Sequence, residues 1–294
     1  MLIESVPNLS EGRRVEVVDA CARDIAATPD VRLLNYSADA SHNRSVFTLL
    51  GHAAALHEAL GRVVERAIHR IDLREARGVH PRIGAVDVVP FVPIGETTMD
   101  ECVALARTFA QDIAERFQLP VYLYERAALR PERRRLEDIR RGEFEGLAAK
   151  MTNAVWRPDY GPSVPHPTAG ATVVGARPFL VAYNINLATD RIDLARAIAT
   201  TIRERDGGLP AVKALGLAID GGRRAQVSMN LTDITRTTMR DVFERVTMEA
   251  ARLGIKIAES ELIGLIPKAA LGGATADDLR LHDFSPDRMI EHFI

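Results

Sequence analysis

The sequence predicts an α/β fold, an α+β sandwich built from two ferredoxin-like subdomains. Three observations carry this prediction. The order strand–helix–strand–strand–helix–strand occurs twice along the 294 residues, which is the βαββαβ order of the ferredoxin-like motif. The apolar spacing changes between alternating and helical periods in step with that order. A segment rich in proline and glycine separates the two runs. We therefore place subdomains at residues 1–176 and 177–294 and expect a ligand cleft between them.

The first subdomain takes its helices from spacing and caps. Leu56, Leu60 and Val63 recur every three or four residues, which is typical of one buried helix face. Thr98, followed by acids in the next turn, predicts a capped helix start. The predicted helices are residues 13–27, 53–71 and 98–117. The predicted strands are residues 2–6, 31–36, 45–51, 86–92 and 121–124.

The second subdomain repeats the pattern. Asp220-Gly221-Gly222 lies between two apolar runs and predicts a hairpin turn. The predicted strands are residues 179–187, 212–219, 226–231 and 256–266. The predicted helices are residues 190–205 and 239–253.

The composition excludes several classes of protein. Hydrophobic residues make up 47% and charged residues 27%, and the formal net charge is −2, so no global field favours nucleic acid or a membrane surface. The longest apolar runs are too short to span a bilayer. Cys21 and Cys102 cannot build a disulfide framework, which fits a reducing, cytoplasmic location. The sequence shows no metal-binding motif, so we expect no metal site and a small-molecule ligand.

Three loop segments carry polar side chains at strand ends. His80 lies on a turn before a buried strand, where a histidine serves as a general base or only caps the turn. Residues 37–46 gather Asp39, His42, Asn43 and Arg44, a set that holds a carboxylate, orients a histidine or forms an Asx turn. In residues 6–12, Asn8 and Ser10 precede a helix, so we expect them to cap it.

The segment between the two subdomains has two parts. Residues 126–141 are rich in arginine and form either a solvated helix face or a landing surface for an anionic ligand tail. Residues 156–175 are so dense in proline and glycine that we expect neither a helix nor a central strand there. This loop is either a linker or a wall that grips a ligand.

Several long motifs, in order, closely resemble the glutamate formimidoyltransferase (formiminotransferase) family. They are VPNLSEG, HNRSVFT, HPRIGAVDVVPFVPI, TMDECVALA, PVYLYERAA, DYGPSVPHPTAGATVVGARPFLVAYNINL and LIGLIP. The resemblance extends from Ile3 to about Ile266, in the same order. The resemblance implies transfer of a formimino group from N-formimidoyl-L-glutamate to N5 of tetrahydrofolate. It further implies a homodimer and, because the chain stops at Ile294, a stand-alone transferase without the cyclodeaminase domain.

The resemblance also assigns residues. The family's catalytic histidine corresponds to His80. Asp39 and His42 stand where animal members of the family have other residues. The family also has a folate-contacting loop, and Val164, Pro165, His166 and Ala169 within it differ from the animal pattern. That loop corresponds to Gly161, Pro162, Ser163, Val164, Pro165, His166, Pro167, Thr168, Ala169 and Gly170.

On this basis neutral His80 removes the N5 proton and returns a proton to the departing nitrogen. Arg44 and Arg82 are candidates for substrate carboxylates, because guanidinium matches carboxylate in two-point contact. Asp39 or Asp87 is a candidate for orienting His80, and Asn43 is an auxiliary site residue. Two alternatives stay open: formyl transfer between N-formyl-L-glutamate and 5-formyltetrahydrofolate, and a non-catalytic folate-binding protein.

Overall fold

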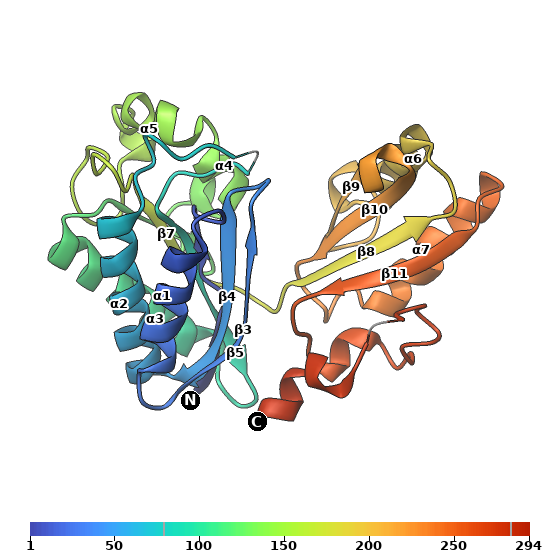
Figure 1. Ribbon diagram of the computed structural model, residues 1–294, viewed down its shortest axis with the longest axis horizontal. Helices are drawn as coiled ribbons and strands as arrows, with labels where there is room; N and C mark the ends of the chain where they lie inside the picture. The colour runs from blue at the N-terminus through green and yellow to red at the C-terminus, as the bar shows by residue number, and fades with distance from the viewer. Residues whose placement is uncertain (79, 283) are drawn as a thin grey trace. The chain divides into compact units, whose positions relative to one another are not determined.

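The computed structural model describes residues 1–78, 80–282 and 284–294. The described chain divides into two compact units, Met1–Arg177 and Pro178–Ile294. Each unit contains the βαββαβ order that the sequence predicts, so the predicted fold class is confirmed (Figure 1). In the part of the chain that the structure describes, no helix is long and apolar enough to cross a membrane.

The first unit is a sheet with helices on both faces. Its strands are β1 (Leu2–Ser5), β2 (Asn8–Leu9), β3 (Val31–Asp39), β4 (Arg44–His52), β5 (Val86–Ile94), β6 (Val121–Glu125) and β7 (Thr172–Ala176). Its helices are α1 (Val15–Ala26), α2 (Ala53–Arg70), α3 (Met99–Phe117), α4 (Leu136–Arg140) and α5 (Glu143–Met151).

The strand order shows how the motif is extended. β3 pairs with β4, β4 pairs with β1 and β2, and these pair with β5, all antiparallel. This is the order of a ferredoxin-like sheet. Beyond β5 the sheet continues with β7 and β6 in parallel. Parallel strands in one sheet must be joined by a crossover connection. Helix α3 provides this connection from β5 to β6.

Alternating side chains of the first unit fill a core on each face of its sheet. Helices α1, α2 and α3 lie on one face of the sheet, and α4 and α5 lie on the other (Figure 1). Leu123 packs in the core of the first face, whereas its neighbours Tyr122 and Tyr124 pack in the other core with Ile139 of α4 and Leu147 of α5. All five side chains are buried. Burying each of the aliphatic side chains among them is worth roughly 1.5–3 kcal/mol. Helix α4 is therefore fixed to the sheet by packing, and it carries an arginine of the candidate site.

The second unit keeps the motif without extension. Its strands are β8 (Val181–Leu187), β9 (Val212–Ile219), β10 (Arg224–Leu231) and β11 (Ile257–Ile263), and its helices are α6 (Ile192–Ile202) and α7 (Met239–Arg252). The strands pair antiparallel in the order β11-β8-β10-β9. Gly221 and Gly222 have φ of 67° and 91° in the turn between β9 and β10, as the glycine signal predicts.

Two local predictions for the first unit are wrong. Residues 172–176 form β7 between β5 and β6, although we expected no central strand in residues 156–175. Most of the prolines and glycines lie before residue 171, and the run of residues 171–174 that follows is mostly apolar and rich in β-branched residues, a feature that the wider window hid. Asn8 belongs to β2, and the Ser10 hydroxyl donates to the Gly84 carbonyl at 2.6 Å instead of capping α1.

Candidate functional site

The candidate site begins where close backbone packing fixes the turn between β3 and β4. A Cβ on Gly12 would lie 2.3 Å from the Asp39 carbonyl oxygen, and one on Gly78 would lie 2.2 Å from that of His42. Glycine at both positions therefore permits this approach. The Gly12 N–H donates to Asn43 Oδ1 at 3.0 Å, and Asn43 has a φ of 50°. Asn43 thus anchors the turn that starts β4.

Arg44, the first residue of β4, contacts the predicted base. Arg44 Nη1 lies 2.7 Å from Nε2 of His80. A guanidinium N–H can only donate, so Nε2 accepts, and the neutral imidazole carries its proton on Nδ1. Both side chains are half-buried. Burial first, then the charges of Arg44 and Arg140, lower the pKa of His80 to about 3. His80 is therefore neutral at physiological pH.

A buried ion pair lies beside this contact. Asp87 on β5 is 1% exposed. It accepts from the Ile83 N–H at 2.7 Å and from Arg140 Nε at 2.8 Å. Its negative charge raises the pKa of His80 against the larger opposing effects. Asp87 accepts its hydrogen bonds from Ile83 and Arg140, so its role in orienting His80 stays a prediction.

Sequence reasoning did not single out Arg140. It lies in the arginine-rich segment that we treated as a solvated face or landing surface, yet its side chain is 14% exposed and pairs with Asp87. The signal available in the sequence was Ile139, an apolar residue within the charged run. Ile139 packs in the core on this face of the sheet, and the next residue, Arg140, reaches Asp87 on β5.

The Asp39 carboxylate forms its hydrogen bonds within its own turn, to His42. It accepts from the His42 backbone N–H at 2.9 Å and lies 2.7 Å from His42 Nδ1. These contacts, the backbone hydrogen bond above all, lower the pKa of Asp39. Both side chains are about half exposed. This is the Asx-turn geometry that the sequence left open.

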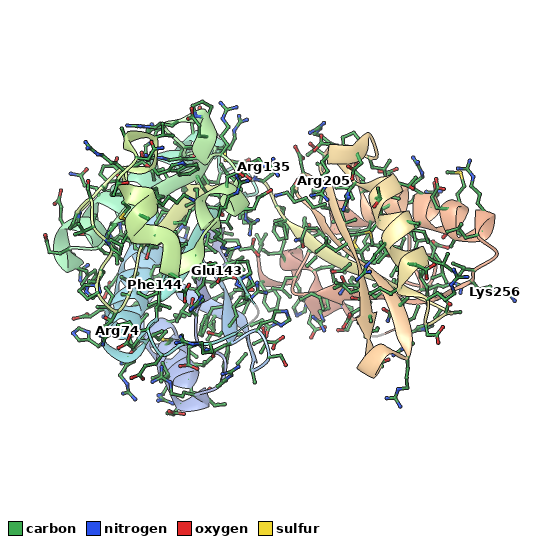
Figure 2. The ribbon with its side chains drawn as sticks, turned by 90° about the horizontal axis from the view of Figure 1, so that it is seen from above. Arg74, Arg135, Glu143, Phe144, Arg205 and Lys256 are labelled. Carbon is green, nitrogen blue, oxygen red and sulfur yellow. The ribbon has the colours of Figure 1, made fainter. Side chains whose placement is uncertain are left out.

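Arg82 lies in an acidic setting. Its side chain is 9% exposed and pairs with Glu143 at 2.9 Å and Glu145 at 2.8 Å. Glu143 and Phe144, labelled in Figure 2, begin α5, and the Phe144 N–H donates to the Arg82 carbonyl at 2.9 Å. A surface hollow of about 400 Å³ is lined by Arg77, Gly78, Arg82, Gly142, Glu143 and Glu145. Arg82 thus holds α5 beside the His80 segment.

The candidate folate loop, residues 161–170, ends in a tight turn tied to the strand after His80. His166 and Gly170 exchange backbone hydrogen bonds at 2.8 and 3.0 Å, and His166 Nδ1 accepts from the Ala169 N–H at 3.0 Å. Burial lowers the pKa of His166. A Cβ on Gly170 would lie 2.1 Å from the Ile83 carbonyl oxygen. The loop and the His80 segment therefore share one backbone junction in the first unit.

Comparison with known proteins identifies the family. Residues 2–177 match the formiminotransferase domain, N-terminal subdomain, and residues 182–278 match the formiminotransferase domain. The chain belongs to the formiminotransferase family. It is therefore a transferase.

Relatives resemble it over most of its length. It is 44% identical to a glutamate formimidoyltransferase of Streptococcus pyogenes, covering 98% of this chain and 97% of the relative. A glutamate formimidoyltransferase of Thermoplasma acidophilum is 41% identical over 99% of this chain and 96% of its own. The formimidoyltransferase-cyclodeaminase of rat is 43% identical over 94% of this chain but only 52% of the relative.

The described residues offer no group of three or more His, Cys, Asp and Glu side chains that could hold a metal ion. What they do bring together is a neutral histidine, two guanidinium groups and one buried carboxylate. Such a set suits proton transfer beside an anionic ligand.

Proposed function

We propose that this formiminotransferase moves a formimino group from N-formimidoyl-L-glutamate to N5 of tetrahydrofolate, with His80 as general base. The Arg44–His80 contact carries the proposal, because it places a guanidinium that can bind a substrate carboxylate 2.7 Å from a neutral imidazole in the first unit. The names of the bacterial and archaeal relatives support glutamate as the carrier of the transferred group. Tetrahydrofolate as acceptor rests on the family resemblance.

The reaction needs one proton acceptor and no redox partner. N5 attacks the formimino carbon, and His80 removes the N5 proton as the new C–N bond forms. The tetrahedral intermediate then collapses, the bond to the glutamate nitrogen breaks, and the proton returns from His80 to that nitrogen. A single side chain therefore serves as base and then as acid. Such help is worth about 10²–10⁴-fold in rate, and holding both substrates side by side contributes at least as much.

The loop of residues 161–170 is the proposed folate contact. Its connection to Ile83 and Gly84 supports this role, because a ligand held by the loop would lie at a fixed distance from the His80 segment. Val164 is 64% exposed at the loop's tip and offers an apolar surface to a flat ring. Val164→Ser should therefore raise the KM for tetrahydrofolate more than the KM for the donor.

A donor assay tests the proposed function. Purified enzyme is given tetrahydrofolate with either N-formimidoyl-L-glutamate or N-formyl-L-glutamate, and the folate product is followed by absorbance. We expect turnover with the formimino donor and a lower kcat/KM with the formyl donor. The reverse ranking would favour formyl transfer. Binding of tetrahydrofolate without product from either donor would favour a non-catalytic folate-binding protein.

A further inference from the structure

Arg44 is an unusual arginine in this unit. Within the described residues, the structure gives Arg44 no carboxylate partner, and its guanidinium donates to a neutral ring nitrogen. Burial first, then the positive charge of Arg140, lower the pKa of Arg44. The charges of Asp87 and Asp39 act on Arg44 only at longer range and raise its pKa against these effects. A half-buried guanidinium without a directly paired carboxylate has lost hydration that one neutral hydrogen bond replaces only in part. It is therefore ready to bind an anion of the right shape.

The same contact blocks the base. The hydrogen bond from Arg44 occupies the Nε2 lone pair, which is the lone pair that would accept the N5 proton. Charged groups face His80 from several elements: Arg44 on β4, Asp87 on β5, Arg140 on α4 and His42 in the turn before β4. Two fixed guanidinium charges against one carboxylate disfavour a proton on the ring. In this state His80 is a poor base, since efficient general bases have a pKa near the working pH.

We infer that Arg44 is a carboxylate-operated switch on the base: the α-carboxylate of the glutamate donor binds Arg44 and draws it from Nε2 of His80. This inference deepens the proposed function and rests on it. A carboxylate competes well for Arg44, because it accepts two charge-assisted hydrogen bonds where imidazole accepts one. Its negative charge also stabilises the imidazolium that forms during the reaction.

The chemistry of the donor points to the α-carboxylate in particular. In N-formimidoylglutamate the reacting nitrogen is attached to Cα, and Cα carries the α-carboxylate. An α-carboxylate on Arg44 would thus hold the departing nitrogen near His80, the group that must return a proton to it. The γ-carboxylate lies two methylene groups farther away and cannot satisfy both contacts at once. His80 therefore becomes an active base only when a donor with an α-carboxylate is bound to Arg44.

The test is a titration of His80 that needs no turnover. The imidazole C–H signals of the intact protein are followed by NMR from pH 8 to 4.5, and the signal missing from His80→Gln is that of His80. We expect His80 to stay neutral over this range in the free enzyme. With saturating L-glutamate, His80 should become protonated within this range, with a midpoint above pH 4.5. The probe 4-aminobutyrate, which keeps the amine and the distal carboxylate but lacks the α-carboxylate, should leave the titration unchanged.

Two variants separate the switch from a general salt effect. Arg44→Gln should let His80 protonate at a higher pH without ligand and should abolish the effect of glutamate. Arg62→Gln, an exposed arginine on α2 that pairs with Glu58, is the matched control and should behave as the native protein. An unchanged His80 titration in Arg44→Gln, or with L-glutamate, would overturn the switch. An equal effect of 4-aminobutyrate would overturn the α-carboxylate assignment. Because these readouts precede chemistry, failure of formimino transfer in the donor assay is a separate result.

Discussion

Arg44 and Arg82 occupy opposite electrostatic settings, although the sequence suggested the same task for both. Arg82 is almost fully buried, and its charge is balanced by ion pairs with Glu143 and Glu145. Arg44 is half-buried, and the structure gives it a neutral imidazole as partner. An arginine whose charge is already balanced by the protein contributes to stability. An arginine whose charge is unbalanced costs stability and gains it back on binding an anion.

This difference explains how one segment can be both rigid and reactive. Arg82 lies two residues after His80 and joins the segment to α5. Arg44 meets His80 from β4 on the ligand-binding side that we propose. The segment is thus held by one guanidinium and regulated by the other. Replacing Arg82 should therefore lower mainly the stability of the fold, and replacing Arg44 should lower mainly the catalytic efficiency.

The largest effect should follow loss of the base that Arg44 contacts. His80→Ala should lower kcat for formimino transfer by about 10²–10⁴-fold, while the thermal unfolding midpoint stays close to that of the native protein. His69→Ala removes an exposed histidine near the end of α2 and should leave kcat unchanged. Near-normal turnover of folded His80→Ala would exclude the general-base role.

Arg44→Gln should reduce kcat/KM for the donor by about 10–100-fold, since a hydrogen bond to a charged group is worth about 1.5–3 kcal/mol. Its free energy of unfolding should be equal to or higher than that of the native protein, because a poorly compensated cation is removed. Steady-state kinetics and chemical denaturation of the same preparation measure both quantities. A large loss of stability would place Arg44 among the structural arginines instead.

Arg82→Gln should show the opposite profile. Removing this buried guanidinium leaves Glu143 and Glu145 unpaired and should cost about 1–3 kcal/mol in the free energy of unfolding, measured by urea denaturation. The KM for the donor should change less than in Arg44→Gln. Arg135→Gln removes an exposed pair with Glu137 and should change stability by less than about 0.5 kcal/mol. If Arg82→Gln raised the KM for the donor more than it lowered stability, Arg82 would be the carboxylate ligand.

Sequence patterns predicted the repeated motif and the capped helix well, because these depend on local spacing. Thr98 and Glu101 form the reciprocal cap that the sequence indicates. The partners of each charged side chain depended on contacts distant in sequence and could not be predicted from spacing. Arg140 reaches Asp87 across 53 residues, and Arg82 reaches Glu145 across 63. The sequence thus listed candidate groups, and only the fold showed which guanidinium was already neutralised.

The smallest expected effect on kcat/KM concerns arginines that contact neither His80 nor the two glutamates, Glu143 and Glu145. Arg126 and Arg134 are exposed in the segment that we treated as a landing surface for an anionic tail. If they attract a polyglutamylated folate, kcat/KM for that substrate should fall more steeply with salt than for the monoglutamate, since exposed charges are screened within about 10 Å at 0.1 M salt. The double substitution Arg126→Gln and Arg134→Gln should remove only this extra dependence, changing kcat/KM a few-fold. Equal salt dependence for the two folates in the native enzyme would show that residues 126–141 do not attract the polyglutamate tail. These arginines would then form only a solvated surface, and Arg44 would remain the proposed anion-binding arginine.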